Sequence, residues 1–534
     1  MTGERHCKRK QYGSSAHWCE ALPASSGAGS DRQRYVRNRA FDRRRPIAAT
    51  PASPPAVHGT LMGLQEVRVR PLTPTRLEST VGSERTTQFE ATAETMRTLL
   101  AGRRVLNVNS TATGGGVAEL LQTLLAYVCG VGIDARWLVI DGNPDFFAIT
   151  KRIHNHLYGT LGDGGPLGPS EHQRYEATLA PNTDELLDLI RPGDVVLLHD
   201  PQTAGMAVPL QEAGISVVWR CHVGLDTQND HSLRAWDFLR PYVEAVPAFV
   251  FSCQQFAPAW MPRDRLFIIP PSIDPFSAKN EPMSPSDVRQ SLQHVGLLDG
   301  ATGQSPATFS RRDGSIGRIS RPVDLLDTGP PPPADVPLVL QASRWDALKD
   351  MPGVMVGFAE NLAEMGTAHL VLAGPSVAGV ADDPEASDVL GECLTIWRTL
   401  PDAVRRRVHL ACMAMTDCDE AAAVVNAVQR HATVVVQKSL AEGFGLTVAE
   451  AMWKARPVVG SAVGGIVDQI IPGETGVLLT DPYDLASFAE SVAQLIADPA
   501  GTDRMGRNGQ NRVLEHFLGD RHLEQWAQVL TQIH

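Results

Sequence analysis

From about Arg103 onwards, short apolar runs alternate with stretches whose apolar residues recur at helical spacing. After the first run, Val117, Leu120, Leu124 and Val128 fall on one helical face. Buried strands that alternate with helices predict a parallel sheet covered by helices on both faces. The strands expected in this series are Val105–Val108, Ala135–Asp141, Asp194–His199, Ser216–His222, Ala248–Ser252 and Leu266–Ile269, with helices around Asp184–Ile190 and His231–Val243.

A second series of the same kind begins at Pro337. The expected fold class is therefore α/β, with two Rossmann-like, doubly wound domains facing each other across a cleft. Ligands of such sheets bind at the carboxyl ends of the strands. The second series comprises strands Leu338–Ala342, His369–Ala373, Val408–Ala411, Thr433–Gln437, Pro457–Gly460 and Gly476–Leu479, and helices Val354–Glu364, Asp388–Leu400, Asp419–Arg430 and Leu446–Lys454.

The alternation stops between about Glu281 and Asp335. Gly300–Ser320 is polar and glycine-rich, and four prolines follow Gly329, which predicts a linker with a disordered insertion. We therefore divide the chain into a disordered basic head (1–60), an N-terminal Rossmann-like domain (61–280), the linker (281–335), a C-terminal Rossmann-like domain (336–515) and a terminal helix (516–534). In two-lobed chains such a helix can pack back on the first domain.

Composition narrows the class of protein. The chain has 534 residues, 43% apolar and 20% charged, and no apolar run long enough to span a membrane. Its N-terminus lacks the apolar core of a signal peptide, and its eight cysteines form no CxxC pair, so we expect a reducing, cytoplasmic location. The net charge of −12 argues against nucleic acid as the main partner.

The charge is unevenly distributed. Residues 1–45 hold eleven Lys/Arg and four acidic residues, which gives +7 and leaves −19 for the rest of the chain. Such a head buries too little apolar surface to order itself. It is either a targeting arm or polyanion tether, or an extension without a role.

Two glutamates frame a glycine-containing turn between the expected strand Thr433–Gln437 and the helix that follows it. Glu442 lies in the turn, and Glu450 lies two turns into the helix, about 12 Å further along its axis. Glycosidase carboxylates flank one bond at roughly 5–9.5 Å. The pair therefore suits the two ends of one long ligand better than acid–base catalysis. Taken singly, each glutamate could equally be an ordinary acidic residue near a helix start.

Two cations follow the first strand of the second series. Arg344 and Lys349 lie at its carboxyl end, where a guanidinium and an ammonium suit a diphosphate. The chain shows no DxD-like pair at a strand end and no Cys/His cluster, so we expect a site without metal or cofactor, in which these cations stabilise a departing diphosphate. A surface ion pair with Asp346 or Asp350 is the alternative.

Weaker signals come from the first series. A turn of three glycines, Gly114, Gly115 and Gly116, precedes a helix and resembles a phosphate-binding turn. A tight turn that binds no ligand can have the same sequence. His222 closes an expected strand, where its imidazole could bind a sugar hydroxyl or serve a structural role.

Together these residues resemble the retaining glycosyltransferases of the GT-B fold, group 1. The Glu442…Glu450 spacing is similar to that class's E-x7-E signature, and Arg344…Lys349 resembles its diphosphate clamp. Over about residues 100–280 and 336–495, the chain resembles the trehalose synthase (glycosyltransferring) branch of this class more closely. The segments that carry this are GGGVAELLQTLLAYVCGVGIDARWLVIDG (114–142), VVWRCHVGLD (217–226), PPSIDPFSAKN (270–280) and EGFGLTVAEAMWKARPVVGSAVGGI (442–466).

The resemblance implies that the domain 61–280 binds the acceptor and the domain 336–515 binds the nucleotide-sugar donor, and it implies a role for each matching residue. Arg344 and Lys349 would neutralise the donor diphosphate, and Glu450 would bind the nucleotide ribose. His222 would contact the sugar near its 6-hydroxyl. One departure is Asp350, which stands where many relatives have a glycine after the lysine, and this puts the shape of the loop in question. Implied catalytic residues are Arg344, Lys349, Glu442 and His222; implied substrate-binding residues are Gly114, Gly115, Gly116, Gly443, Phe444, Gly445, Leu446, Thr447 and Glu450.

The resemblance thus implies transfer of glucose from a nucleoside diphosphate glucose to glucose, with retention, to form trehalose. A trehalose phosphorylase or a transferase with another acceptor is the nearer alternative, and a non-catalytic sugar-nucleotide sensor is the farther one. A homodimer is compatible with the sequence. The donor base stays open, as do the acceptor-binding residues, for which Asn143, His154 and Asn155 are only neighbouring candidates.

Overall fold

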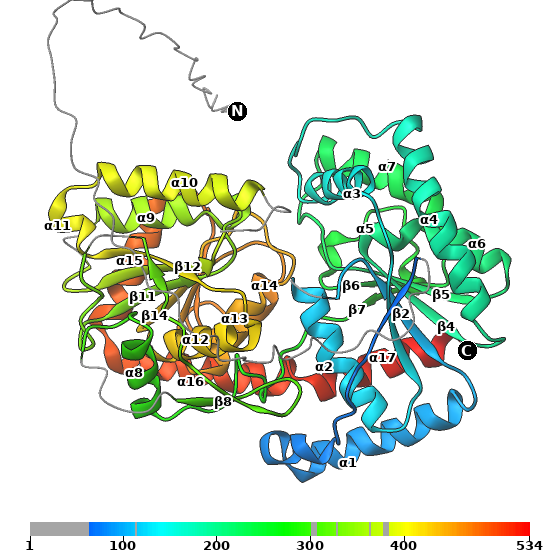
Figure 1. The fold of residues 1–534 in the computed structure, drawn as a ribbon, viewed down its shortest axis with the longest axis horizontal. Coiled ribbons are helices and arrows are strands. Elements are labelled where there is room, and N and C mark those ends of the chain that lie inside the picture. Colours follow the sequence, from blue (N-terminus) through cyan, green and yellow to red (C-terminus); the bar gives the residue numbers. More distant parts are fainter. Residues whose placement is uncertain are drawn as a thin grey trace, which may run out of the picture. The chain divides into compact units, whose positions relative to one another are not determined.

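The computed structural model describes residues 63–112, 115–300, 307–326, 329–361, 365–377 and 384–533. They belong to one compact unit, Thr60–His534, which contains two lobes, each built on its own sheet (Figure 1). The expected basic head (1–60) and Gly114 lie outside the described residues, so the predictions about them stay predictions.

The sheet of the first lobe runs in the order β1-β3-β2-β4-β5-β6-β7 within the described residues. Its strands are parallel, except that β1 pairs antiparallel with β3. The strands are β1 (Gln65–Val67), β2 (Val105–Asn109), β3 (Ala135–Val139), β4 (Val195–His199), β5 (Ser216–Cys221), β6 (Ala248–Phe251) and β7 (Leu266–Ile268).

Helices cover both faces of this sheet, as expected for parallel strands that are mostly apolar. On one face, Leu106, Leu198 and Trp219 pack against α3, α4 and α7; on the other, Val105 and Val195 pack against α1 and α17. The helices are α1 (Thr75–Leu99), α2 (Gly116–Gly130), α3 (Pro144–Leu157), α4 (Pro169–Leu189), α5 (Asp200–Thr203), α6 (Ala207–Glu212), α7 (Asp230–Val243) and, from the end of the chain, α17 (Gly519–Ile533).

The sheet of the second lobe repeats this plan, in the order β10-β13-β12-β11-β14-β15-β16 across the residues described. Its strands are parallel apart from β10, which pairs antiparallel with β13 at the edge. The strands are β10 (Asp324–Leu325), β11 (Leu338–Ala342), β12 (His369–Pro375), β13 (Val408–Met413), β14 (Val434–Gln437), β15 (Val458–Ser461) and β16 (Val477–Leu479).

Alternate residues of these strands again face opposite helical layers. Leu340 and Val435 join the core formed with α8, α12 and α13, whereas Val339 and Val434 face α9, α10 and α15. Observed strands lie within two residues of those expected in both series. The helices are α8 (Pro285–His294), α9 (Met351–Glu360), α10 (Pro384–Thr399), α11 (Asp402–Arg405), α12 (Cys418–His431), α13 (Leu446–Trp453), α14 (Ile466–Gln469), α15 (Leu485–Ala497) and α16 (Pro499–His516).

The segment 281–335 differs from the expected linker with a disordered insertion. Its described residues form α8, a hairpin of β8 (Thr308–Ser310) and β9 (Ile316–Arg318), and the edge strand β10. Leu292, Phe309 and Ile319 are buried in the core of the second lobe. For these described residues the expectation was wrong, because a few apolar residues, too sparse to give a periodic pattern, are enough to hold a polar segment on an existing core.

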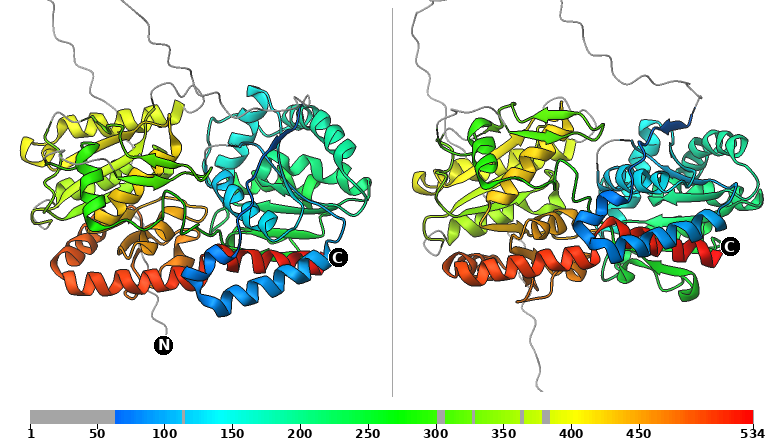
Figure 2. Two further views of the ribbon diagram at one scale, coloured as in Figure 1. Left: turned by 60° about the horizontal axis from the view of Figure 1, so that its bottom comes forward. Right: turned by 90° about the horizontal axis from the view of Figure 1, so that it is seen from below.

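The chain ends by returning to the first lobe. After α16, the amide of Ile273 donates to the carbonyl of Phe517 at 2.9 Å, and α17 then lies beside α1 (Figure 2). Ala527 and Leu530 of α17 are buried against the first sheet. None of the described helices is long and apolar enough to cross a membrane.

Candidate active site

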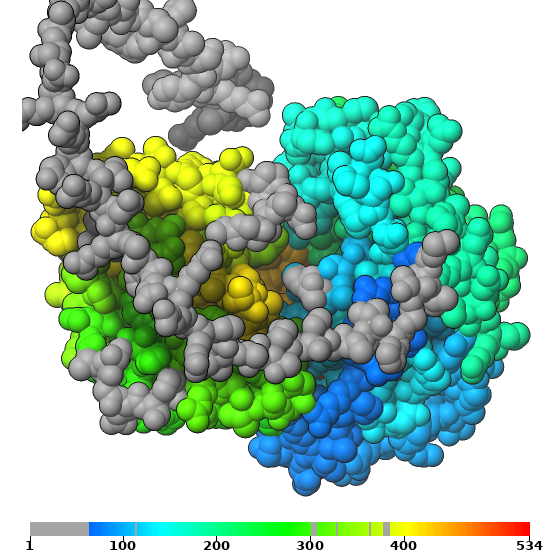
Figure 3. Space-filling view, in the orientation of Figure 1, coloured from blue at the N-terminus to red at the C-terminus, as the bar shows by residue number. Residues whose placement is uncertain are grey.

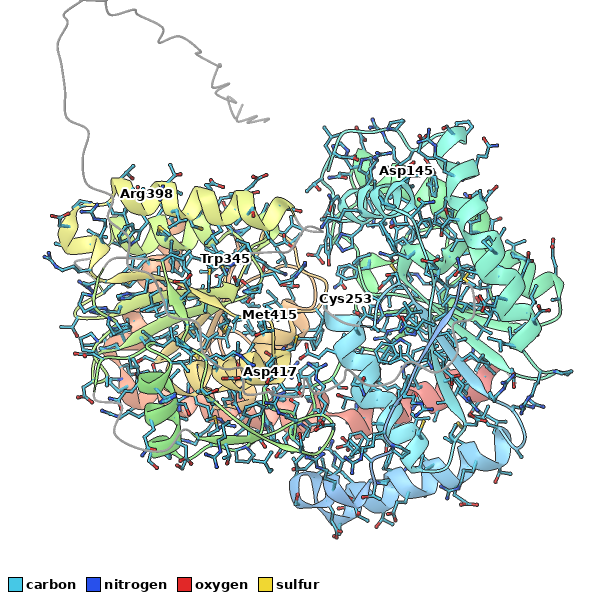
Figure 4. The ribbon with its side chains drawn as sticks, viewed as in Figure 1. Asp145, Cys253, Trp345, Arg398, Met415 and Asp417 are labelled. Carbon is cyan, nitrogen blue, oxygen red and sulfur yellow. The ribbon has the colours of Figure 1, made fainter. Side chains whose placement is uncertain are left out.

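The loop after β11 carries the two predicted cations. The Arg344 side chain is 55% exposed and pairs with Asp346 at 3.1 Å. The next residue, Trp345, is buried and its Nε1 donates to the carbonyl of Pro375 at 2.9 Å, which fastens the loop to β12 (Figure 4). Lys349 ends a 3-10 turn, and its side chain is only 15% exposed.

Asp350 adopts the left-handed conformation (φ 48°, ψ 44°) that a glycine would provide at this position. Two side-chain contacts hold it there. Its carboxylate forms an ion pair with the buried Lys438, and it accepts a hydrogen bond from the amide of Gly353 at 3.1 Å, which caps α9. The loop therefore keeps a glycine-like shape at Asp350, and an ion pair supports the strained backbone.

The cation loop meets the Glu442 loop directly. Lys349 Nζ donates to Glu442 Oε2 at 2.6 Å, and Ser439 Oγ donates to the same oxygen at 3.1 Å. The Glu442 side chain is 10% exposed. Two motifs separated by 93 residues are thus brought into contact at the carboxyl ends of the adjacent strands β11 and β14.

The turn that follows Glu442 touches the first lobe. A Cβ at Gly443 would lie 2.7 Å from the carbonyl oxygen of His222 and 2.9 Å from the Tyr158 hydroxyl, so only glycine allows this approach. Cys253 Sγ donates to the Gly443 carbonyl at 3.7 Å, and Gly445 has φ +83° just before α13. Phe444 is buried, and Thr447 Oγ1 donates to Gln437 Oε1 at 2.8 Å.

The glycine turn of the first lobe lies opposite the start of α13. Gly115 has φ +79° and directly precedes α2. A Cβ at Gly116 would lie 3.2 Å from Leu446 Cδ1. The described part of this turn therefore faces the same loop as Glu442, and Gly114 is outside the described residues.

Glu450 is buried on α13, with 4% of its side chain exposed. Its Oε1 lies 3.4 Å from Lys279 Nζ, and its Oε2 has no hydrogen-bond partner among the described residues. Lys279 also pairs with Glu119 of α2 at 2.7 Å. Burial alone would lower the pKa of Lys279, but the carboxylates of Glu450 and Glu119 raise it, so the lysine is charged.

His222 is held from both sides of its ring. Nδ1 lies 3.1 Å from Asp200 Oδ1, and Arg220 Nε donates to Nε2 at 2.6 Å. His199 stacks on its face with 5.6 Å between ring centroids. Burial lowers the pKa of His222, despite the opposing effect of Asp200, so the imidazole is neutral at pH 7. Its contact with Asp200 assigns the proton to Nδ1 and leaves Nε2 as an acceptor.

The neighbouring acceptor candidates are placed differently. His154 packs against Tyr158 with 4.9 Å between ring centroids, next to the tyrosine hydroxyl that approaches Gly443. Asn143 Oδ1 accepts from the amide of Phe146 at 2.9 Å and so caps α3. Asn155 lies beside Gly162, where a Cβ would come within 3.0 Å of Asn155 Nδ2.

Four residues at this site were not singled out from the sequence: Asp200, Tyr158, Lys279 and Asp226, whose Oδ2 accepts from the amide of Gly464 at 2.7 Å. A signal existed for Asp200, because it directly follows an expected strand end. It also has φ +63°, a strained conformation for a residue other than glycine. Among the described residues, no group of three or more His, Cys, Asp or Glu side chains is arranged to hold a metal ion.

Family models match both lobes. Residues 107–258 match the model "Trehalose synthase, N-terminal domain", and residues 420–512 match "Glycosyl transferases group 1".

Similar curated proteins extend over most of the chain. A trehalose synthase of Pyrococcus horikoshii is 31% identical over 85% of this chain and 95% of its own length. A trehalose synthase of Rubrobacter xylanophilus is 35% identical over 81% of this chain and 91% of its own. A trehalose phosphorylase of Pleurotus pulmonarius is more distant, at 24% identity over 73% of this chain and 52% of its own.

Solved structures share the fold at low sequence identity. The α,α-trehalose 6-phosphate synthase of Burkholderia multivorans covers 80% of this chain, and 98% of its own, with a TM-score of 0.58 and 15% identity. HepE of Anabaena, in complex with UDP and glucose, covers 80% of this chain, and 99% of its own, with a TM-score of 0.53 and 15% identity. The fold of this chain is GT-B, as the sequence predicted.

Proposed function

Because the chain belongs to the trehalose synthase family of group 1 glycosyltransferases, we propose that it transfers glucose from a nucleoside diphosphate glucose to glucose and forms α,α-trehalose with retention. The observation that carries the proposal is the contact between Lys349 and Glu442 at 2.6 Å. It joins the residue suited to a diphosphate and the residue suited to a sugar in one site at the strand ends.

The diphosphate of the donor binds Arg344 and Lys349 in this proposal. Arg344 is half exposed and has one carboxylate partner, so its guanidinium is free to turn toward a bidentate anion. The ammonium of Lys349 forms an ion pair with Glu442, and an incoming diphosphate would bind the same ammonium. Fixed cations stabilise the negative charge that develops on the leaving group. That HepE was solved with UDP and glucose supports a nucleoside diphosphate donor for this fold.

The sugar and the ribose of the donor bind on either side of α13. Glu442 and the amides at Gly443–Leu446 hold the sugar hydroxyls, since the start of α13 offers free N–H groups. Glu450 accepts from the ribose hydroxyls, because its Oε2 is buried without a partner among the described residues. Gly115 and Gly116 border the donor and the acceptor, and at Gly116 a Cβ would lie 3.2 Å from Leu446 Cδ1, so a side chain there would narrow the space between them.

His222 contacts the donor sugar near its 6-hydroxyl in this proposal. Its Nε2 is an acceptor, so it can receive the hydroxyl proton, provided that Arg220 gives up or shares that nitrogen. Asp200 keeps the ring in the required tautomer through Nδ1.

Chemistry proceeds at the anomeric carbon. The bond between C1 and the diphosphate oxygen breaks, a bond from C1 to the acceptor hydroxyl oxygen forms on the same face, and the acceptor proton passes to the departing diphosphate. No second carboxylate is needed as a base in this sequence of events. Contact between the Gly443 turn and the first lobe keeps water, the competing acceptor, away from C1.

The test is incubation of the purified chain with ADP-, UDP- and GDP-glucose plus glucose, followed by identification of the disaccharide by chromatography and NMR. We expect α,α-trehalose and stoichiometric nucleoside diphosphate. A different disaccharide would revise the acceptor, and trehalose made only from glucose 1-phosphate, or consumed only with inorganic phosphate, would establish a phosphorylase. Tight nucleotide binding in calorimetry without turnover would establish a sensor.

A further inference from the structure

The first lobe contains an apolar cavity of about 90 Å³ on the face of its sheet that carries α1, α2 and α17. Leu121 and Leu125 of α2, Met96 of α1 and Trp526 of α17 are among its lining residues. Thr92, Val131 and Leu523 also line it and are partly exposed, so the cavity reaches the surface near these residues. The outer surface of α1 is the blue edge of the lobe in Figure 3.

The inner end of this cavity is polar. Arg220 and His199, which are 1% and 2% exposed, both line it. Arg220 donates through Nε to His222 and through Nη2 to the carbonyl of Ile269, but its Nη1 has no partner among the described residues. His199 Nδ1 is likewise without a partner within the described part of the chain.

The cavity therefore has a buried cation facing it. Burial lowers the pKa of Arg220 to about 10, which still leaves the guanidinium charged at pH 7. No carboxylate of the described residues forms an ion pair with it, although the charge of nearby Asp200 opposes the lowering of its pKa. The guanidinium also lies over the ring of Trp526, with 5.5 Å between Cζ and the ring centroid. A buried charge is costly unless it is paired, so this guanidinium is poised for an anion.

We propose that this cavity is a second ligand site, which binds a short aliphatic carboxylate. The carboxylate pairs with Arg220 Nη1 and the alkyl chain occupies the apolar part between α1, α2 and α17. Arg220 supplies charge-assisted hydrogen bonds, and leucine, methionine and tryptophan side chains supply the apolar wall. A volume of about 90 Å³ holds roughly three water-sized groups, so the cavity takes only the first methylene groups of a short chain such as hexanoate, and the end of the chain lies at the opening near Thr92, Val131 and Leu523.

The test uses calorimetry and thermal melting with hexanoate, hexan-1-ol and acetate. Ala93 lines the cavity from α1, so Ala93→Leu fills it, while Ala91→Leu adds the same side chain to an exposed position of the same helix. We expect the unaltered chain to bind one hexanoate and to bind hexan-1-ol and acetate at least tenfold more weakly. We expect Ala93→Leu to lower the affinity for hexanoate at least tenfold and Ala91→Leu to leave this affinity unchanged.

Hexanoate that gives neither binding heat nor a melting shift would overturn the proposal. Equal affinity for hexan-1-ol would also overturn it, because the guanidinium would then play no part. If Ala93→Leu does not fold, Ala527→Leu narrows the cavity from α17. The comparison of hexanoate with hexan-1-ol needs no variant at all. Arg220→Gln should reduce hexanoate binding to the level of hexan-1-ol, and unchanged hexanoate binding would contradict the site.

Discussion

At the scale of single residues, the contact between Lys349 and Glu442 predicts how the site responds to truncation. Lys349→Ala and Glu442→Ala should each lower kcat/KM with the best donor by roughly 30- to 1000-fold, since one lost electrostatic partner of a transition state costs about 2–4 kcal/mol. In the double variant the loss of transition-state stabilisation should be smaller than the sum of the two single losses, because the two side chains are in contact. Nucleotide-release rates check this.

Arg398→Ala is a suitable control for charge removal. Arg398 lies in the last turn of α10, is exposed, and belongs to no part of the proposed site (Figure 4). Its loss should leave turnover unchanged. Rates near wild type in Lys349→Ala and Glu442→Ala alike would contradict the proposed mechanism.

Asp350 allows backbone strain to be separated from ion pairing. Asp350→Gly should relax the strained left-handed backbone, but it leaves the buried ammonium of Lys438 without its carboxylate. The second effect is larger, so we expect the free energy of unfolding to fall by about 3 kcal/mol. Asp350→Asn should lower the free energy of unfolding by less, because asparagine tolerates this conformation and its side chain still accepts a hydrogen bond. Urea unfolding measures both. A glycine variant as stable as wild type would contradict this prediction, because the relaxed backbone would then offset the whole loss of the ion pair.

At the scale of elements, the hairpin β8–β9 and the segment after it are fastened to the start of α12. The carboxylate of Glu420 accepts from the amides of Ser320 and Arg321 at 2.6 and 2.7 Å and pairs with the Arg321 side chain. Asp417 and Asp419 pair with Arg311 and Arg312 at 2.6 Å each. Acidic groups at a helix N-terminus are also favoured by its dipole.

This fastening predicts local opening when it is removed. In Glu420→Gln the carbonyl oxygen can still accept from the amides of Ser320 and Arg321, but the NH2 group faces the Arg321 guanidinium in place of a carboxylate oxygen. We therefore expect the free energy of unfolding to fall by about 1–3 kcal/mol and tryptic cleavage between residues 311 and 321 to become faster. Limited proteolysis read by mass spectrometry checks it. Glu490→Gln, at an exposed position of α15, is the matched control and should be cleaved like wild type.

At the scale of the whole molecule, buried neutral histidines should make stability depend on acid. Burial lowers the pKa values of His199, His222 and His522, so the folded chain stays unprotonated where the unfolded chain takes up protons. The free energy of unfolding therefore has its full value above about pH 6.5 and falls as the pH drops below this value. Each histidine lowers it by about 1.4 kcal/mol per pH unit, until the pH reaches the pKa of that histidine in the folded chain.

His522→Gln should reduce this acid dependence by one histidine's share. His522 lies on α17, where Nδ1 is 3.0 Å from the carbonyl of Pro270 and Nε2 accepts from Trp526. Glutamine provides one donor group and one acceptor, so it can keep both contacts without titrating. Unfolding free energies at pH 5 to 8 measure the slope, and an identical slope in both proteins would contradict this reasoning.

Much of the fold could be predicted because parallel strands that are buried on both faces are mostly apolar. The strands from β2 to β7 and from β11 to β16 are mostly apolar, with single polar residues such as Asn107 and Gln341, and they were expected within two residues of where they lie. The antiparallel edge strands β1 and β10 were missed, since Gln65–Val67 and Asp324–Leu325 are short and partly polar. Their pairing depends on the neighbouring strand more than on their own residues.

What the sequence by itself determined about this chain is the two-sheet α/β plan, together with the residue types at the strand ends: two cations in one loop, and two glutamates around a glycine turn in another. These follow from local pattern and short spacing. Only the tertiary structure decided that Lys349 touches Glu442, that Lys438 holds Asp350, and that Asp200 orients His222. Such contacts join residues from separate strands, and their geometry is set by how the sheets and their helices pack, which no local pattern encodes.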